Sequence, residues 1–152
     1  MRRWISFVLT AGATIAVALP GDAGAAPPAL NPCTLVKTNE AAQALGAPVT
    51  QRLFPSETLE CHYRTAAALE LSVVMMTPDY FERHESDATT RASGIGNKAY
   101  WVKDPVTPVG ASLSVLKGGN AVRLDVLAPT IQNPRRWQPM LVRLGKLAAS
   151  RM

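Results

Sequence analysis

The stretch ASLSVLKGGNAVRLDVL, residues 111–127, decides the fold, because its residues sort by polarity onto two faces of one hairpin. Gly118 and Gly119 sit at its centre, and glycine tolerates the positive φ angles of a two-residue turn. The residues that this turn places opposite each other are Val115 and Val122, Leu113 and Leu124, and Ala111 and Val126 on an apolar face, with Ser114 and Arg123, and Ser112 and Asp125, on a polar face. The stretch therefore predicts two antiparallel strands with one buried face.

A second hairpin is predicted nearer the N-terminus, from residues 58–64 and 69–76, joined by a loop over residues 66–68. Both segments alternate between apolar and polar residues, which is typical of a half-buried strand. The expected pairs are Tyr63 with Leu71, Cys61 with Val73, and Leu59 with Met75 inside, and Arg64 with Glu70 outside. A slip of one residue would expose the apolar set, so the register is well specified.

Three helices and a further strand are expected around these hairpins. Thr38 is a suitable N-cap for a helix over residues 39–45, which Gly46 ends. Thr77, Pro78 and Asp79 begin a second helix that continues to about residue 90. Residues 94–96 form a tight turn around Gly94 and Gly96, followed by a strand near 98–103. A third helix starts at residues 133–134, and Pro139 either kinks it or marks its true first turn.

The resulting order is α-β-β-α-β-β-β-α. Because hairpins dominate, we expect an α+β fold with an antiparallel sheet of about five or six strands and helices packed on one face. The length of 152 residues suits one domain, which we place at residues 33–150.

The N-terminus is typical of a secretory signal peptide. Arg2 and Arg3 precede an apolar run over residues 5–19, and an Ala-Gly-Ala site ends at Ala25. We expect cleavage after residue 25, a flexible lead-in over residues 26–32, and a periplasmic or extracellular protein without stable membrane insertion. Retention of the apolar run as a membrane anchor is the alternative.

Charge gives no sign of a nucleic-acid partner. The whole chain has 16 basic and 11 acidic residues, and removing residues 1–25 leaves 14 and 10, a net charge of +4. Nucleic-acid binders concentrate basic residues on one face, with aromatic residues between them. Here the basic residues are scattered, so we expect no nucleic-acid binding.

The cysteines Cys33 and Cys61 are expected to form a disulfide, as cysteine pairs do in exported proteins. A catalytic pair of Cys61 and His62 is the competing interpretation. Adjacent strand residues point to opposite faces, so the thiol and the imidazole cannot meet while this segment is extended. The disulfide is therefore preferred.

Other chemical constellations are weaker. Histidine and methionine side chains suggest Cu(I), but Met75 and Met76 diverge on a strand and are better explained as packing residues. The Gly94-x-Gly96-x-x-Ala99 pattern resembles a dinucleotide fingerprint, yet a helix precedes it and a strand follows, the reverse of that motif. We therefore predict no catalytic residues, no metal site and no cofactor.

Tyr100 and Trp101 are the candidate binding surface. They are adjacent on a predicted strand, so one of the two rings must lie outside the main core. Exposed aromatic side chains are frequent anchors of interfaces. Equally, Trp101 can serve as a contact beneath the loop over residues 104–110.

Three segments together resemble a family: NPCTLVKTNEAAQALG, ECHY and GIGNKAYW. The chain is similar to small exported proteins and lipoproteins with a domain of unknown function. The matching positions are Pro32, Cys33, Leu35, Leu45, Gly46, Cys61, Tyr63, Gly94, Gly96 and Ala99. The resemblance implies a fold and an envelope location but no catalytic residues. Many such proteins carry a lipid-acceptor cysteine, which this sequence lacks.

The preferred hypothesis is an exported, disulfide-linked binding or accessory module of the cell envelope, without catalytic activity. Its partner would be an unknown protein or an apolar small ligand. One alternative is an envelope enzyme whose site is assembled from residues distant in the sequence. Another alternative is a periplasmic metal carrier.

Overall fold

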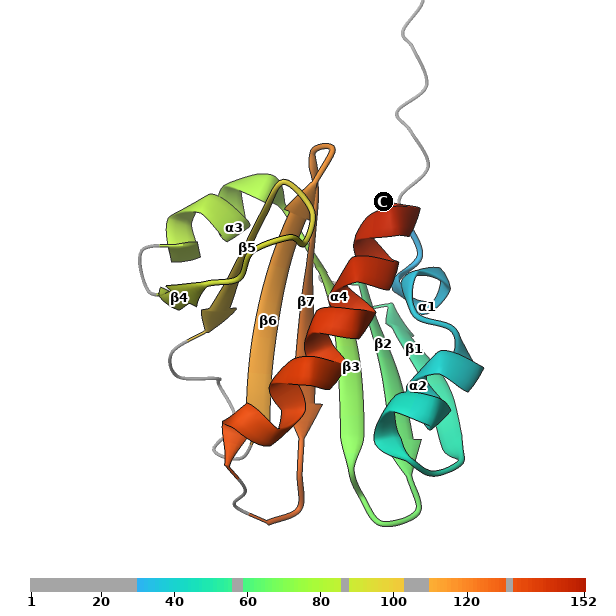
Figure 1. The fold of residues 1–152 in the computed structure, drawn as a ribbon. Coiled ribbons are helices and arrows are strands. Elements are labelled where there is room, and N and C mark those ends of the chain that lie inside the picture. Colours follow the sequence, from blue (N-terminus) through green and yellow to red (C-terminus); the bar gives the residue numbers. More distant parts are fainter. Residues whose placement is uncertain (1–29, 56–58, 86–87, 103–109, 131–132) are drawn as a thin grey trace, which may run out of the picture.

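A computed structural model describes residues 30–55, 59–85, 88–102, 110–130 and 133–152 (Figure 1). The predicted signal peptide, and the lead-in up to residue 29, lie outside the described residues. The elements in chain order are α1 (Pro32–Leu35), α2 (Thr38–Leu45), β1 (Val49–Pro55), β2 (Leu59–Thr65), β3 (Glu70–Met76), α3 (Pro78–Glu85), β4 (Ala88–Arg91), β5 (Lys98–Val102), β6 (Gly110–Lys117), β7 (Asn120–Leu127), the 3-10 helix η1 (Pro134–Trp137) and α4 (Gln138–Arg151).

The strands form one antiparallel sheet in the order β1-β2-β3-β7-β6-β5-β4. The two predicted hairpins are β2–β3 and β6–β7, and they meet at the centre, where β3 pairs with β7. All five predicted residue pairs of β6–β7 are confirmed. In β2–β3 the pairs Tyr63–Leu71, Cys61–Val73 and Arg64–Glu70 are confirmed. Alternating polarity was therefore sufficient to set both registers.

The main core lies between the sheet and the helices α1, α2 and α4 (Figure 1). It joins inward residues of the central strands, such as Leu71, Val73 and Leu124, to Leu141 and Leu144 of α4, all fully buried. Leu35 and Val36 close the same core from the α1 side. We call the sheet surface on this side the inner face and the opposite surface the outer face.

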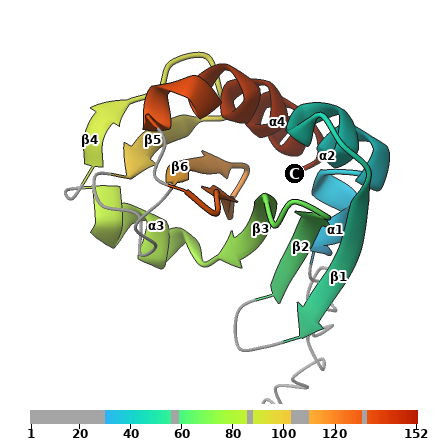
Figure 2. The same cartoon turned by 90° about the horizontal axis from the view of Figure 1, so that it is seen from below.

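Helix α3 lies on the outer face, so the prediction that all helices cover one face is wrong. Figure 2 shows α3 on the opposite side of the sheet from α4 and α2. Its Phe81 packs with Tyr100 and Ala121 in a second apolar cluster, separate from the main core. Alternation turns Tyr100 and Ala121 outward, and α3 removes that apolar surface from water.

The predicted strand number and element order also need correction. The sheet has seven strands instead of five or six, because β1 and β4 were not foreseen. Strand β1 is an edge strand with a largely exposed sequence, so it lacks the alternating pattern that marks a half-buried strand. Strand β4 falls in a segment assigned to the second helix, which ends at Glu85 instead of near residue 90.

The helix termini follow local chemistry. Lys37 is the N-cap of α2, and the Glu40 carboxylate accepts a hydrogen bond from its backbone amide at 2.8 Å. Gly46 ends this helix with φ of 71°. Pro139 lies in the first turn of α4, after a short 3-10 turn, so it starts that helix instead of kinking it.

Candidate functional site

The two cysteines form a disulfide, with a Cα–Cα distance of 5.2 Å. Cys61 is fully buried in the main core, and Cys33 belongs to α1, so the bond joins the first helix to β2. The Tyr63 hydroxyl donates a hydrogen bond to the carbonyl oxygen of Val36 beside this link. Burial raises the pKa of Tyr63 above its ordinary value, so the phenol stays protonated and can donate.

His62 lies on the outer face, away from the sulfur atoms, so no Cys–His pair exists. Its Nδ1 is 2.6 Å from a carboxylate oxygen of Glu70, and its Nε2 is 3.0 Å from one of Glu60. The edge of the ring also packs on Phe54, with centroids 4.6 Å apart. Both ring nitrogens are therefore engaged by carboxylates, which leaves neither placed to activate a nucleophile.

The two residues of the predicted aromatic surface differ in exposure: Tyr100 is buried, and Trp101 is half-buried. Tyr100 is 2% exposed, and its hydroxyl donates to the carbonyl oxygen of Phe81 at 3.1 Å. Burial raises the pKa of Tyr100. Tyr100 is the ring outside the main core, but α3 covers it. Trp101 is half-buried against the main core and lines a second pocket of about 320 Å³ with polar residues near the start of η1.

The predicted turn glycines all have positive φ angles: Gly94, Gly96, Gly118 and Gly119. Gly96 has a further constraint, because a Cβ atom there would lie 2.5 Å from the carbonyl oxygen of Leu116. The Gly94–Gly96 turn therefore brings the backbone close to β6, instead of forming a phosphate cradle at a helix N-terminus.

A polar network occupies the centre of the outer face. The Nε atom of Arg123 donates to Asp125 at 2.8 Å, and the Ser112 hydroxyl donates to the same carboxylate at 2.5 Å. Burial opposes the charge of Arg123, but Asp125 and Tyr80 outweigh burial and raise the pKa of the guanidinium. Arg123 is thus a partly buried cation on the outer face, and its ion pair with Asp125 holds it in place.

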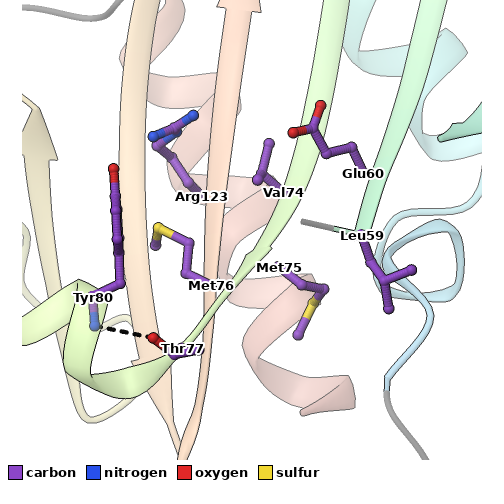
Figure 3. Close-up of a pocket in the computed structure, with 8 residues that line it drawn as sticks. All are labelled: Leu59, Glu60, Val74, Met75, Met76, Thr77, Tyr80 and Arg123. Carbon is purple, nitrogen blue, oxygen red and sulfur yellow. Dashed lines mark hydrogen bonds between the residues drawn. The ribbon is translucent and has the colours of Figure 1, made fainter. Parts of the chain in front are cut away.

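Beside this network lies a groove of about 370 Å³, which we call the outer-face groove (Figure 3). Its lining comes from β2, β3, α3 and β7, and consists of Leu59, Glu60, Val74, Met75, Met76, Thr77, Tyr80 and Arg123. Most of these side chains are apolar, and the formal charges in the lining are those of Glu60 and Arg123. This composition is typical of a small-molecule site.

The strand register explains the arrangement of the groove. Glu60 pairs with Val74, and Val74 pairs with Arg123, so these three residues form one row across three strands. Figure 3 shows Glu60 and Arg123 on the two sides of Val74, with Met76 next to Arg123. Tyr80 stands at the Arg123 side, where its backbone amide bonds the Thr77 hydroxyl at 3.2 Å. Helix α3 therefore builds one wall, and the sheet builds the floor.

The outer-face groove could not be predicted from the sequence. The two hairpin registers were available, but the row of Glu60, Val74 and Arg123 requires the pairing of β3 with β7 as well. That pairing is not local in the sequence. The placement of α3 on the outer face, which brings Tyr80 to the groove, was likewise not anticipated.

Comparisons with protein-family models, with curated proteins and with solved structures found no match for this chain. Within the residues that the structure describes, no cluster of three or more His, Cys, Asp or Glu side chains is arranged to hold a metal ion. None of the described helices is long and apolar enough to cross a membrane.

Proposed function

We propose that this chain is an exported binding module of the cell envelope, without catalytic activity, that holds a small apolar ligand in the outer-face groove. The observation that carries the proposal is the groove itself. It combines an apolar floor with a few fixed polar groups, as ligand sites usually do.

The chemistry of the floor supports a small ligand over a large protein partner. Met76 supplies a flexible thioether side chain on the outer face, and such side chains adapt to irregular apolar shapes. Tyr80 is 38% exposed, more than most large apolar side chains in the part of the chain that the structure describes. An apolar ligand would cover this ring and the thioether of Met76, which provides the hydrophobic driving force.

Export is supported by two independent features. The first 25 residues have the charge and hydropathy pattern of a signal peptide. The disulfide between Cys33 and Cys61 suits an oxidising compartment, because thiols stay reduced in the cytosol.

The absence of catalytic activity is proposed from the position of His62. A general base needs a free nitrogen within reach of a nucleophile. Both nitrogens of His62 face carboxylates, and its neighbour Cys61 is in the disulfide. Elsewhere on the outer face, Arg123 and Asp125 are joined as an ion pair.

Titration with the neutral fluorophore N-phenyl-1-naphthylamine tests the proposal. The fluorophore should bind, and Met76→Gln should weaken its affinity about threefold to tenfold, because the groove loses apolar surface. Leu53→Gln is the matched control, since Leu53 is 42% exposed and lies outside the groove. Equal affinities for both variants and the unmodified chain would place the fluorophore elsewhere and contradict the proposed site.

A further inference from the structure

We infer that the natural ligand of the outer-face groove is a zwitterionic amphiphile, a molecule that carries neighbouring anionic and cationic groups on an apolar body. The inference rests on the proposed function, because it names the class of ligand for the same groove. It comes from the position of the two charges relative to the apolar floor.

Glu60 and Arg123 flank the floor at a spacing that the sheet fixes. They lie in one row with Val74, on strands that are each one step from β3. Neighbouring strands are about 4.8 Å apart, so the backbones of β2 and β7 are separated by about 10 Å. The carboxylate and the guanidinium thus stand on opposite sides of the buried Val74, on the sheet that forms the floor.

Each charge is held in place by a partner outside the groove. Glu60 contacts the Nε2 atom of His62 at 3.0 Å, and Arg123 donates through Nε to Asp125 at 2.8 Å. The guanidinium has four further N–H donors, one of them near the Tyr80 side chain, and planar arrays of this kind favour carboxylate or phosphate groups. Held side chains lose little conformational entropy when a ligand binds, so their charges are preorganised.

Charge balance selects against ligands with a single charge. The formal charges of the lining are one carboxylate and one guanidinium, so its net formal charge is zero. An anion gains contacts with Arg123 but faces Glu60, and a cation has the reverse problem. A zwitterion meets an opposite charge on each side of Val74, which is how electrostatic complementarity produces specificity.

The apolar part of the ligand would lie along Val74, Met76 and Tyr80. Val74 and Met76 are on the outer face of β3, and Tyr80 stands beside them on α3 (Figure 3). The groove volume of about 370 Å³ is at the lower end of the range for small-molecule sites, so it suits one short chain or ring. The same chemistry occurs in free zwitterionic metabolites and in zwitterionic lipid headgroups, and the experiment must separate these sources.

Calorimetric titration with four octyl compounds, each below its micelle concentration, tests the inference. Octylphosphocholine is the zwitterion, octyl sulfate the anion, octyltrimethylammonium the cation, and octyl glucoside the neutral compound. We expect octylphosphocholine to bind about tenfold more tightly than each of the others, the gain from one charge-assisted contact. A fifth titration uses vesicles of dioleoylphosphatidylcholine.

Two groove variants and two matched controls locate the effect. Glu60→Gln and Arg123→Lys should each remove most of the preference for octylphosphocholine, since lysine keeps the charge but lacks the planar donors. Glu70→Gln is the control for Glu60→Gln, because Glu70 also contacts His62 but does not line the groove. Arg64→Gln is the control for Arg123→Lys, as an exposed outer-face arginine. Both controls should bind octylphosphocholine within about twofold of the unmodified chain, well below the change expected for a lost contact.

The outcomes separate the inference from the proposed function. Equal binding of all four octyl compounds would overturn the zwitterion preference and leave the apolar groove intact. Failure of all four compounds and of N-phenyl-1-naphthylamine would overturn both. Binding to vesicles without binding to octylphosphocholine would show that the protein recognises a membrane surface and not a single amphiphile in the groove. This result would also overturn the inference.

Discussion

Arg151 and Glu40, the last helical residue and a residue of α2, form a two-pronged ion pair that ties the two ends of the domain together. The two terminal nitrogens of Arg151 lie 2.7 and 2.6 Å from the two carboxylate oxygens of Glu40. One of these nitrogens also donates to the carbonyl oxygen of Leu35 at 2.8 Å. The Arg151 side-chain hydrogen bonds, acting against burial, lower the pKa of Glu40 from 4.5 to about 2.

This ion pair predicts an acid-dependent loss of stability. The folded pKa of Glu40 is below its ordinary value, so the pair stabilises the fold fully above about pH 4.5 and not below about pH 2. We expect Glu40→Gln to lower the free energy of unfolding at pH 7 by about 1 kcal/mol, and the difference to vanish as the pH falls to 2. Urea denaturation from pH 7 to pH 2 measures it.

Glu82→Gln is the matched control for Glu40→Gln. Glu82 contacts Lys98 at 2.9 Å, but both side chains are 47% exposed. Exposed pairs contribute little to stability, so this variant should resemble the unmodified chain at every pH. A constant difference between Glu40→Gln and the unmodified chain down to pH 2 would contradict the role assigned to Arg151.

The disulfide should provide a large part of the stability. It joins residues separated by 28 positions, and closing such a loop stabilises a fold by about 3.5 kcal/mol in the chain-entropy description. We expect the double variant Cys33→Ala/Cys61→Ala to lose about this amount in urea denaturation, and reduction of the unmodified chain to have a similar effect. Two free thiols in unreduced, unfolded protein would disprove the bond.

Gly110 should not tolerate a side chain. A Cβ atom at this position would lie 1.6 Å from the carbonyl oxygen of Val126, a backbone atom of β7 that cannot move alone. We expect Gly110→Ala to destabilise the fold by more than about 3 kcal/mol, because β6 must separate from β7. Thermal denaturation measures the change.

Gly46→Ala is the control for Gly110→Ala. It measures the conformational cost of replacing a glycine where no steric clash occurs. A Cβ atom at Gly46 would meet nothing within 4 Å, although its φ of 71° disfavours alanine. The cost should therefore be the conformational penalty alone, about 1 kcal/mol. Similar losses for the two variants would show that close packing of β6 against β7 is not the reason for glycine at residue 110.

The sequence predicted those parts of the fold that depend on contacts between neighbouring segments. The alternation within residues 111–127 was sufficient to specify the β6–β7 register, because a tight glycine turn leaves one pairing that buries the apolar set. The disulfide could be predicted because the chain has two cysteines. Neither inference needed information about distant segments.

The sequence did not predict features that depend on the whole sheet. The burial of Tyr100 on the outer face could not be predicted, because Phe81, which packs on it, comes from α3, which is distant in the chain. The groove could not be predicted for the same reason, because Glu60 and Arg123 are brought into one row only by the pairing of β2 and β7 with β3. The outer face has apolar residues at one end and polar residues at its centre. The sequence of its strands therefore has no regular alternation of polarity from which a groove could be predicted.

Phe81 connects the stability of α3 to the groove, and this relationship supplies the last prediction. Phe81 is fully buried against Tyr100, with ring centroids 4.7 Å apart, while its neighbour Tyr80 forms the groove wall. Phe81→Ala should destabilise α3 strongly, since removing a buried phenyl ring costs about 3–5 kcal/mol. Hydrogen exchange should then be faster in residues 78–85 than in the β6–β7 hairpin, and the affinity for N-phenyl-1-naphthylamine should fall.

Tyr100→Phe removes only the hydroxyl group, which donates to the carbonyl oxygen of Phe81, so it should cost about 1 kcal/mol and leave the affinity unchanged. Uniformly faster exchange across the sheet in Phe81→Ala would show that α3 is an integral part of the main core instead of a separate wall on the outer face.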